Sequence, residues 1–220
     1  MAAGILRFRL CDNGFDCEHC LLDAALRGEH AAPAEPGRSD DDLPPDRLYA
    51  AGHAWLQPRS GRTGVWRAGL DPFAASLLGD GLDLHLARPD RPLRRGQPLC
   101  EIRIGTGGLA IGAPVRGHLL RCNGRLRADP GLLLTDPYGH GWIAELVPDD
   151  PAEMHDLDSH PAAAARLAAD RLRFRRAAAV ALLAPLDPQD RPAPDRPRRT
   201  DLHDLLGPRA YLELLRDFIR

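Results

Sequence analysis

Apolar and polar residues alternate in several short segments in the middle of the chain. Residues 82–87, 100–104 and 142–147 each place apolar side chains at every second position, which is the period of a strand with one buried face. Glycine-rich turns separate these segments. Several short strands broken by turns are typical of a sandwich or barrel. We therefore expect residues 48–147 to form a mainly β domain.

The pattern changes to helix in the remainder, residues 148–220. Pro161 suits a first helical turn, and the Ala- and Arg-rich stretch that follows it favours helix by propensity. The proline-rich stretch 185–198 cannot form regular structure and is interpreted as a linker. A last amphipathic helix follows, and Gly207-Pro208 is expected to divide it into two pieces.

The beginning of the chain has a different character. Residues 1–30 combine an alternating segment, a cysteine cluster and a short helical pattern that ends at Gly28. Residues 31–47 are rich in Pro, Asp, Gly and Ala and are interpreted as a linker. The chain is thus expected to carry a cysteine-containing segment, one β domain and a helical extension.

Composition narrows the classes of function. Hydrophobic residues make up 44% of the 220 and charged residues 27%, which is typical of a globular protein. The net charge is -2 and the aromatic share 5%, so nucleic-acid binding is not expected. No apolar run is long enough to cross a bilayer, and Arg7 and Arg9 interrupt any secretory signal. We expect a cytoplasmic protein whose cysteines are reduced.

Six short motifs occur in order along the middle of the chain. They are His53-Ala-Trp55, Gly69-Leu-Asp-Pro-Phe-Ala74, Leu78-Gly-Asp80, Ala113-Pro-Val-Arg-Gly117, Asn123 and Asp136-Pro-Tyr-Gly-His-Gly-Trp142. In this order they resemble the H-protein family of the glycine cleavage system. The resemblance implies a barrel-sandwich hybrid fold for residues 48–147. It also implies a carrier role, in which one lysine at a hairpin tip holds lipoate and presents it to partner enzymes.

The lysine that the resemblance requires is missing. Counting back eight places from Pro114, as in the family, leads to Thr106, and all 29 residues in the Lys+Arg total are arginines. Lipoate is joined through an amide, which needs an amine nucleophile. Thr106 offers a hydroxyl, and the guanidinium of Arg103 stays protonated and unreactive. We expect a module without lipoate.

Other chemistry is not indicated in the β domain. The stretch Gly105-Thr-Gly-Gly108 is followed by a strand-like segment and lacks the helix N-terminus that a phosphate loop uses. No Gly-x-Ser-x-Gly motif of a serine hydrolase is present. We therefore expect no catalytic residue and no enzymatic activity.

A second informative motif lies near the start of the chain. Cys17 and Cys20 have the spacing that directs two thiolates to one metal, and Cys11 would give a third ligand. His30 is a candidate for the fourth position. Zinc is favoured because an iron-sulfur cluster normally needs four cysteines. A redox Cys-x-x-Cys pair and unreactive thiols remain alternatives.

The combined expectation is an H-protein-like binding or regulatory module that contacts protein partners, among them glycine-cleavage or lipoate-related enzymes. A metal- or redox-responsive protein that uses the cysteine cluster is one alternative. A component of glycine cleavage or of lipoate-linked sulfur metabolism that acts without its own lipoyl group is another. Fold resemblance cannot choose among them, because function depends on the residues of a site.

Overall fold

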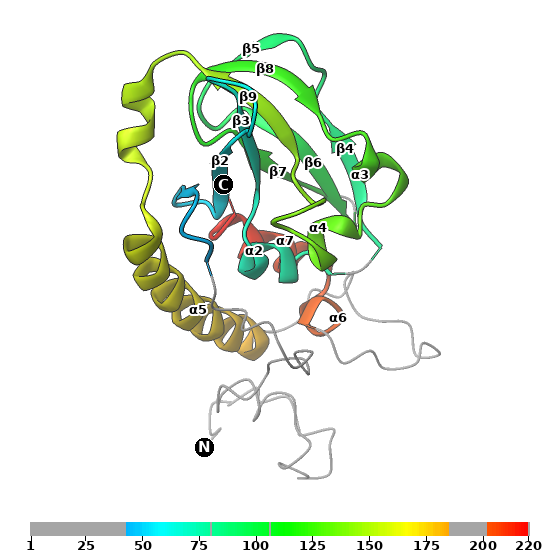
Figure 1. The fold of residues 1–220 in the computed structure, drawn as a ribbon. Coiled ribbons are helices and arrows are strands. Elements are labelled where there is room, and N and C mark those ends of the chain that lie inside the picture. The colour runs from blue at the N-terminus through cyan, green and yellow to red at the C-terminus, as the bar shows by residue number, and fades with distance from the viewer. Residues whose placement is uncertain (1–42, 80, 106, 185–201, 220) are drawn as a thin grey trace, which may run out of the picture.

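The computed structural model describes residues 43–79, 81–105, 107–184 and 202–219 (Figure 1). The predicted zinc ligands Cys11, Cys17 and Cys20 lie outside the described residues, as does His30. The same holds for Thr106, for Asp80 of the Leu-Gly-Asp motif and for the proline-rich linker.

Two antiparallel sheets form the β domain, and the larger one has six strands in the order β1-β2-β3-β9-β8-β5. These strands are β1 Leu48–Tyr49, β2 Ala54–Pro58, β3 Trp66–Leu70, β9 Ala144–Pro148, β8 Gly117–Cys122 and β5 Arg91–Leu93. The central pair β3 and β9 joins segments far apart in the chain, because Trp66 lies opposite Leu146. The larger sheet therefore pairs a strand from the beginning of the β domain with one from its end.

The smaller sheet has three strands in the order β4-β6-β7. They are β4 Asp83–Leu86, β6 Pro98–Ile104 and β7 Gly107–Gly112. Residues alternate between buried and exposed along β6, where Ile102 and Ile104 are buried while Glu101 and Arg103 are exposed. This is the alternation that the sequence predicts for a strand with one face on the core.

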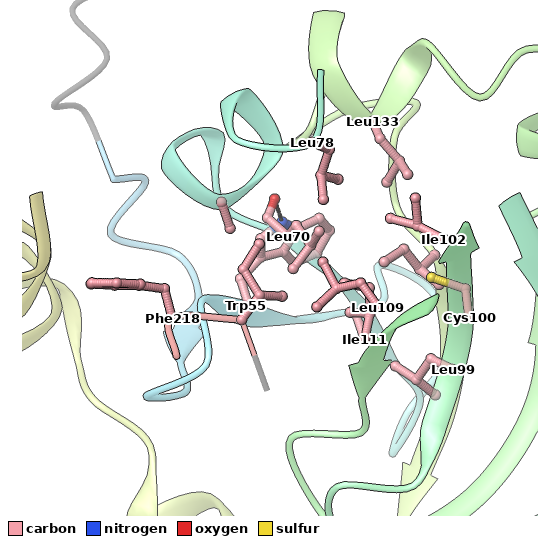
Figure 2. Packing of buried hydrophobic residues seen from close by; sticks show 14 of the residues in the cluster. Trp55, Leu70, Leu78, Leu99, Cys100, Ile102, Leu109, Ile111, Leu133 and Phe218 are labelled. Atoms are coloured by element: carbon pink, nitrogen blue, oxygen red, sulfur yellow. Dashed lines mark hydrogen bonds between the residues drawn. The ribbon is translucent and has the colours of Figure 1, made fainter. Parts of the chain in front are cut away.

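The inner faces of the two sheets share one hydrophobic core (Figure 2). Trp55 and Leu70 come from the larger sheet, whereas Ile102, Leu109 and Ile111 come from the smaller one, and all five are almost fully buried. The predicted barrel-sandwich hybrid is thereby confirmed as a mainly β domain with helices attached.

Short helices lie between the strands of the domain. They are α2 Pro72–Ser76, α3 Arg125–Ala128 and α4 Leu132–Thr135. Asp71 caps α2 by accepting a hydrogen bond from the Ala74 N–H at 2.8 Å, and Pro72 occupies the first turn.

Several of the six motifs have clear structural roles. The Trp55 indole donates to the Leu70 carbonyl at 2.8 Å, and a Cβ at Gly69 would lie 2.5 Å from the Trp55 ring, so this position needs glycine. The Asn123 amide donates to the carbonyls of His140 and Trp142 at 2.7 and 2.8 Å. It therefore fastens the end of β8 to the Asp136–Trp142 loop.

The helices at the carboxyl end extend from the β domain. A 3₁₀ turn, η1 Pro151–Asp156, leads to the long helix α5 His160–Leu183, and α6 Leu202–Leu206 and α7 Pro208–Arg216 follow. The break that Gly207-Pro208 predicts between α6 and α7 is confirmed, and Gly207 has a φ of 78°. Helix α5 runs beside the domain, and α7 lies against the same end as α2 (Figure 1). No helix in the described parts of the chain is long and apolar enough to cross a membrane.

Candidate functional site: the β6–β7 hairpin and the helix that covers it

The hairpin between β6 and β7 is where the family resemblance places the attachment residue. Ile104 lies opposite Gly107, and Arg103 lies opposite Gly108, so the connection is tight. Gly105 has a φ of +59°, a backbone conformation that residues other than glycine rarely adopt. The position that the family resemblance assigns to the carrier lysine, Thr106, lies between these glycines in the sequence and outside the described residues.

The described residues of the hairpin do not fit lipoyl attachment. Arg103 points outward with 60% of its side chain exposed and lies 4.0 Å from the carboxylate of Asp83. Its guanidinium is permanently protonated and cannot form the amide. The neighbouring strand residue Glu101 is also exposed and is an acid. No primary amine is therefore present on the described part of the hairpin.

Helix α7 covers one face of the hairpin end. A Cβ at Gly105 would lie 2.7 Å from the Cβ of Pro208, and a Cβ at Gly107 would overlap the Cδ2 atom of Leu212. The Arg216 guanidinium donates to the Gly108 carbonyl at 2.9 Å. The two glycines thus allow the helix to approach the hairpin backbone closely.

The same helix is fixed to other elements of the fold. The Tyr211 hydroxyl donates to the carbonyl of Leu77, just after α2. Beyond the helix end, the Phe218 ring meets Phe174 of α5 edge-on at 5.3 Å, and Phe174 meets Phe73 of α2 at 5.9 Å. A chain of aromatic contacts therefore connects α7, α5 and α2.

A buried histidine between two acids lies at the junction of α5 and the β domain. The Nδ1 atom of His53 lies 2.8 Å from Asp71 Oδ2, and its Nε2 atom lies 3.8 Å from Asp170 Oδ2. His53 is 2% exposed and Asp170 5%. The Asp170 carboxylate also accepts from Arg173 at 2.5 Å. Both side chains are buried, and Asp170 belongs to the buried row of α5, so we assign these groups to the packing of α5.

Three arginines surround one acid on the larger sheet. Glu145 is fully buried and lies 2.8 Å from Arg59, 3.1 Å from Arg67 and 2.7 Å from Arg121. Burial would raise the pKa of Glu145, but the hydrogen bonds from Arg121 and Arg67 outweigh it, so the pKa lies below its ordinary value. The Trp142 ring lies 5.0 Å from the guanidinium carbons of Arg67 and Arg121. The cluster fastens β3 to β9 and β8.

Metal binding finds no support within residues 43–79, 81–105, 107–184 and 202–219, which contain no group of three or more His, Cys, Asp or Glu side chains that could hold an ion. The two cysteines of the β domain are unsuited to ligation or nucleophilic attack. Burial raises the pKa of Cys100 and of Cys122, which opposes the thiolate form that both roles require. The proposed zinc ligands lie outside these residues and are not tested by them.

Two contacts of this arrangement are not predicted by the sequence, although each has a signal in it. Gly107 stands in the glycine-rich stretch 105–108, and its missing side chain permits the approach of Leu212. Asp170 stands in the buried row of α5 formed by Ala163, Leu167, Asp170, Phe174 and Ala178. A charged residue in an otherwise apolar row indicates a buried partner, here His53.

Known proteins are similar to the middle part of this chain. The family model described as glycine cleavage H-protein matches residues 47–170, which is more than half of the chain. The glycine cleavage system H proteins of Alteromonas mediterranea and Thermus thermophilus are each 32% identical over 116 residues, covering 53% of this chain and 88% of theirs. That of Mycobacterium avium is 35% identical over 113 residues, covering 51% of this chain and 84% of its own.

A solved structure is also similar. The glycine cleavage system H protein of Mycobacterium marinum aligns with a TM-score of 0.49 and 26% identity, covering 57% of this chain and 99% of its own. The family match ends at residue 170, within α5. Helices α6 and α7 therefore lie outside the matched part.

Proposed function

Because this chain belongs to the glycine cleavage H-protein family, we propose that it is an H-protein module that binds partner enzymes without carrying a lipoyl group. In this role it is not itself an enzyme. Its partners are proteins of the glycine-cleavage kind, and its effect on them is exerted through binding. The proposal extends the family assignment to a chain that lacks the family's attachment residue.

One observation carries the proposal: the sequence contains no lysine. The family's amide linkage needs an amine, and Thr106 occupies the position where that amine is expected. Neither a threonine hydroxyl nor an arginine guanidinium can take its place. Carrier chemistry is therefore removed while the fold is kept.

The parts of the domain that give it shape support a binding role. The His-x-Trp and Gly-Trp motifs keep their packing, since Trp55 is fully buried and Asn123 holds the loop that ends at Trp142. A domain packed in this way can present the surface of the family fold to a protein partner.

A competition experiment tests the proposal. In a reconstituted glycine cleavage reaction, this chain is added to a fixed amount of a lipoylated H-protein. A module that docks but carries nothing should raise the apparent KM for the lipoylated H-protein and leave kcat unchanged. Turnover supported by this chain alone, with no other H-protein present, would contradict the proposal.

The cysteine segment is proposed as a separate feature of the same protein. Cys11, Cys17 and Cys20 fall within ten residues of one another, which favours a zinc site over isolated thiols. A redox role for Cys17 and Cys20 remains the alternative. The binding role of the β domain does not depend on which is correct.

A further inference from the structure

We propose that an arginine patch on the outer face of the larger sheet is the docking surface for an acidic segment of a partner protein. The patch consists of Arg59, Arg62, Arg67 and Arg121. The inference rests on the proposed function, because it names the face through which the module binds a partner and the chemistry of the segment that it binds.

The pairing of the strands places part of the patch on the outer face of the sheet (Figure 1). Glu145 of β9 lies opposite Arg67 of β3 and Arg121 of β8. The next residue along β3, Ala68, and the residue before Glu145, Ala144, are fully buried in the shared core. Because adjacent residues of a strand point to opposite faces, Arg67, Glu145 and Arg121 point away from that core.

The connection between β2 and β3 supplies the other two arginines. The Arg59 Nε atom lies 2.8 Å from the Glu145 Oε1 atom, so Arg59 reaches the same face. The Arg62 N–H donates to the Arg59 carbonyl at 3.1 Å, and Arg62 is exposed. Within the parts of the chain that the structure describes, Arg62 forms no ion pair.

Positive charge exceeds negative charge in the patch. Its four arginines are paired with one acid in the described structure, namely Glu145. Four positive charges against one negative charge leave three that no acid balances. The whole chain has a net charge of -2, so this surplus is a local feature of the outer face.

The geometry leaves hydrogen-bond donors available for a second carboxylate. Arg121 holds Glu145 with two nitrogens, at 2.7 and 2.9 Å, whereas Arg67 donates only through its Nε atom at 3.1 Å. The terminal nitrogens of Arg59 and Arg67 have no hydrogen-bond partner among the described residues, and these side chains are 29% and 27% exposed. A guanidinium fork of this kind matches a carboxylate.

The surroundings of the patch favour a protein segment over a membrane or a nucleic acid. The large apolar side chains that are exposed in the described structure all belong to α5, namely Leu172, Val180 and Leu183, so the patch offers no apolar anchor for a bilayer. Trp142 is only 8% exposed and lies against two arginines of the patch. It therefore offers no open ring on which a base could stack.

A fluorescein-labelled glutamate homopeptide is the probe, and its binding to the full chain is measured by fluorescence anisotropy at several salt concentrations. Arg59→Gln combined with Arg62→Gln removes two charges of the patch. This double variant keeps Arg67 and Arg121, whose hydrogen bonds hold the buried Glu145.

A matched control removes two charges elsewhere. Arg175→Gln combined with Arg176→Gln changes two exposed positions of α5. Arg62→Glu is the second patch variant, because it reverses one charge at an exposed position without touching the contact between Arg59 and Glu145. It keeps the test valid should Arg59→Gln lower the stability of the sheet.

We expect wild type and control to bind the peptide alike, and more weakly as salt rises. The patch double variant should bind about fivefold more weakly, as for the loss of two exposed ion pairs, and Arg62→Glu should weaken binding in the same direction. An equal loss in the patch and control variants would overturn the proposal, because the attraction would then be general. So would the absence of peptide binding by wild type at low salt, or binding to phosphatidylserine vesicles without binding to the peptide.

The same variants in the glycine cleavage competition separate this inference from the proposed function. If the patch double variant raises the apparent KM for the lipoylated H-protein as much as wild type does, the docking surface is refuted and the binding role stands. If the peptide binds at the patch but wild type does not compete, the proposed function fails and the acidic-segment site stands.

Discussion

The Nε2 atom of His53 lies 3.8 Å from the Oδ2 atom of Asp170, although 117 residues separate them in the sequence. The contact joins the start of β2 to the middle of α5, and both side chains are buried. Since Asp71 holds the other ring nitrogen, the imidazole lies between two acids.

This geometry predicts an energetic coupling between His53 and Asp170. His53→Asn and Asp170→Asn should each lower the free energy of unfolding, and Asn tolerates the φ of 65° at position 53. A double-mutant cycle measured by urea unfolding should give a coupling of about 0.5–3 kcal/mol, as for residues in one network.

The exposed pair His85 and Asp83, 3.1 Å apart, is the matched control. Its coupling should be only about 0–1 kcal/mol, because solvent screens exposed pairs. A coupling for the buried pair no larger than that of the exposed pair would mean that Asp170 is not a partner of His53.

Glu145 gives a prediction about pH. Glu145→Gln removes the charge that three arginines surround. The arginine side chains are 27–47% exposed and stay hydrated, so the change should cost about 1–3 kcal/mol near neutral pH. The folded-state pKa of Glu145 lies below its ordinary value of 4.5. Its contribution to stability is therefore full above that value and is lost as pH falls through the lowered pKa.

The difference in unfolding free energy between wild type and Glu145→Gln should accordingly shrink in acid. Urea unfolding at a series of pH values between neutrality and about 3 measures it. Glu101→Gln, on the exposed face of β6, should show little difference at any pH. A Glu145→Gln difference that stays constant down to the lowest pH would refute this account of the cluster.

The cysteine segment predicts metal content. Protein purified without chelator should hold about one zinc per chain, with Cys11, Cys17 and Cys20 filling three tetrahedral positions. The zinc should dissociate as pH falls, because protonated thiols do not ligate. Elemental analysis of wild type beside a Cys17→Ser, Cys20→Ser double variant tests this.

Cys100→Ser and Cys122→Ser serve as controls for that measurement, because burial raises the pKa of both thiols and both belong to the β domain. They should leave the zinc content unchanged. Equal zinc in wild type and the double variant, or none in a folded wild type, would contradict a zinc site. The cysteines would then be a redox pair or unreactive thiols.

The strands and their buried faces could be predicted from the sequence because their determinants are local. Alternation along residues 100–104 directs Ile102 and Ile104 to the core, and Gly207-Pro208 ends one helix and begins another. Both features depend on residues next to one another in the chain.

The contacts across the fold could not be predicted in the same way. Two such contacts are Leu212 against Gly107 and His53 beside Asp170. Both depend on how α5 and α7 pack against the β domain. Amphipathic helices reveal that they need a partner but not which surface they meet. The strand β9 also begins only at Ala144, two residues later than the alternation suggests, since the Trp142 carbonyl accepts from Asn123.

Intact mass after co-expression with a lipoate ligase shows whether this chain carries lipoate, with an H-protein that has its lysine as the positive control. The control should gain the mass of a lipoyl group, while this chain, which has no lysine, should keep the mass of its sequence. A lipoyl adduct on this chain, located by peptide mapping to any of its residues, would contradict the proposed function.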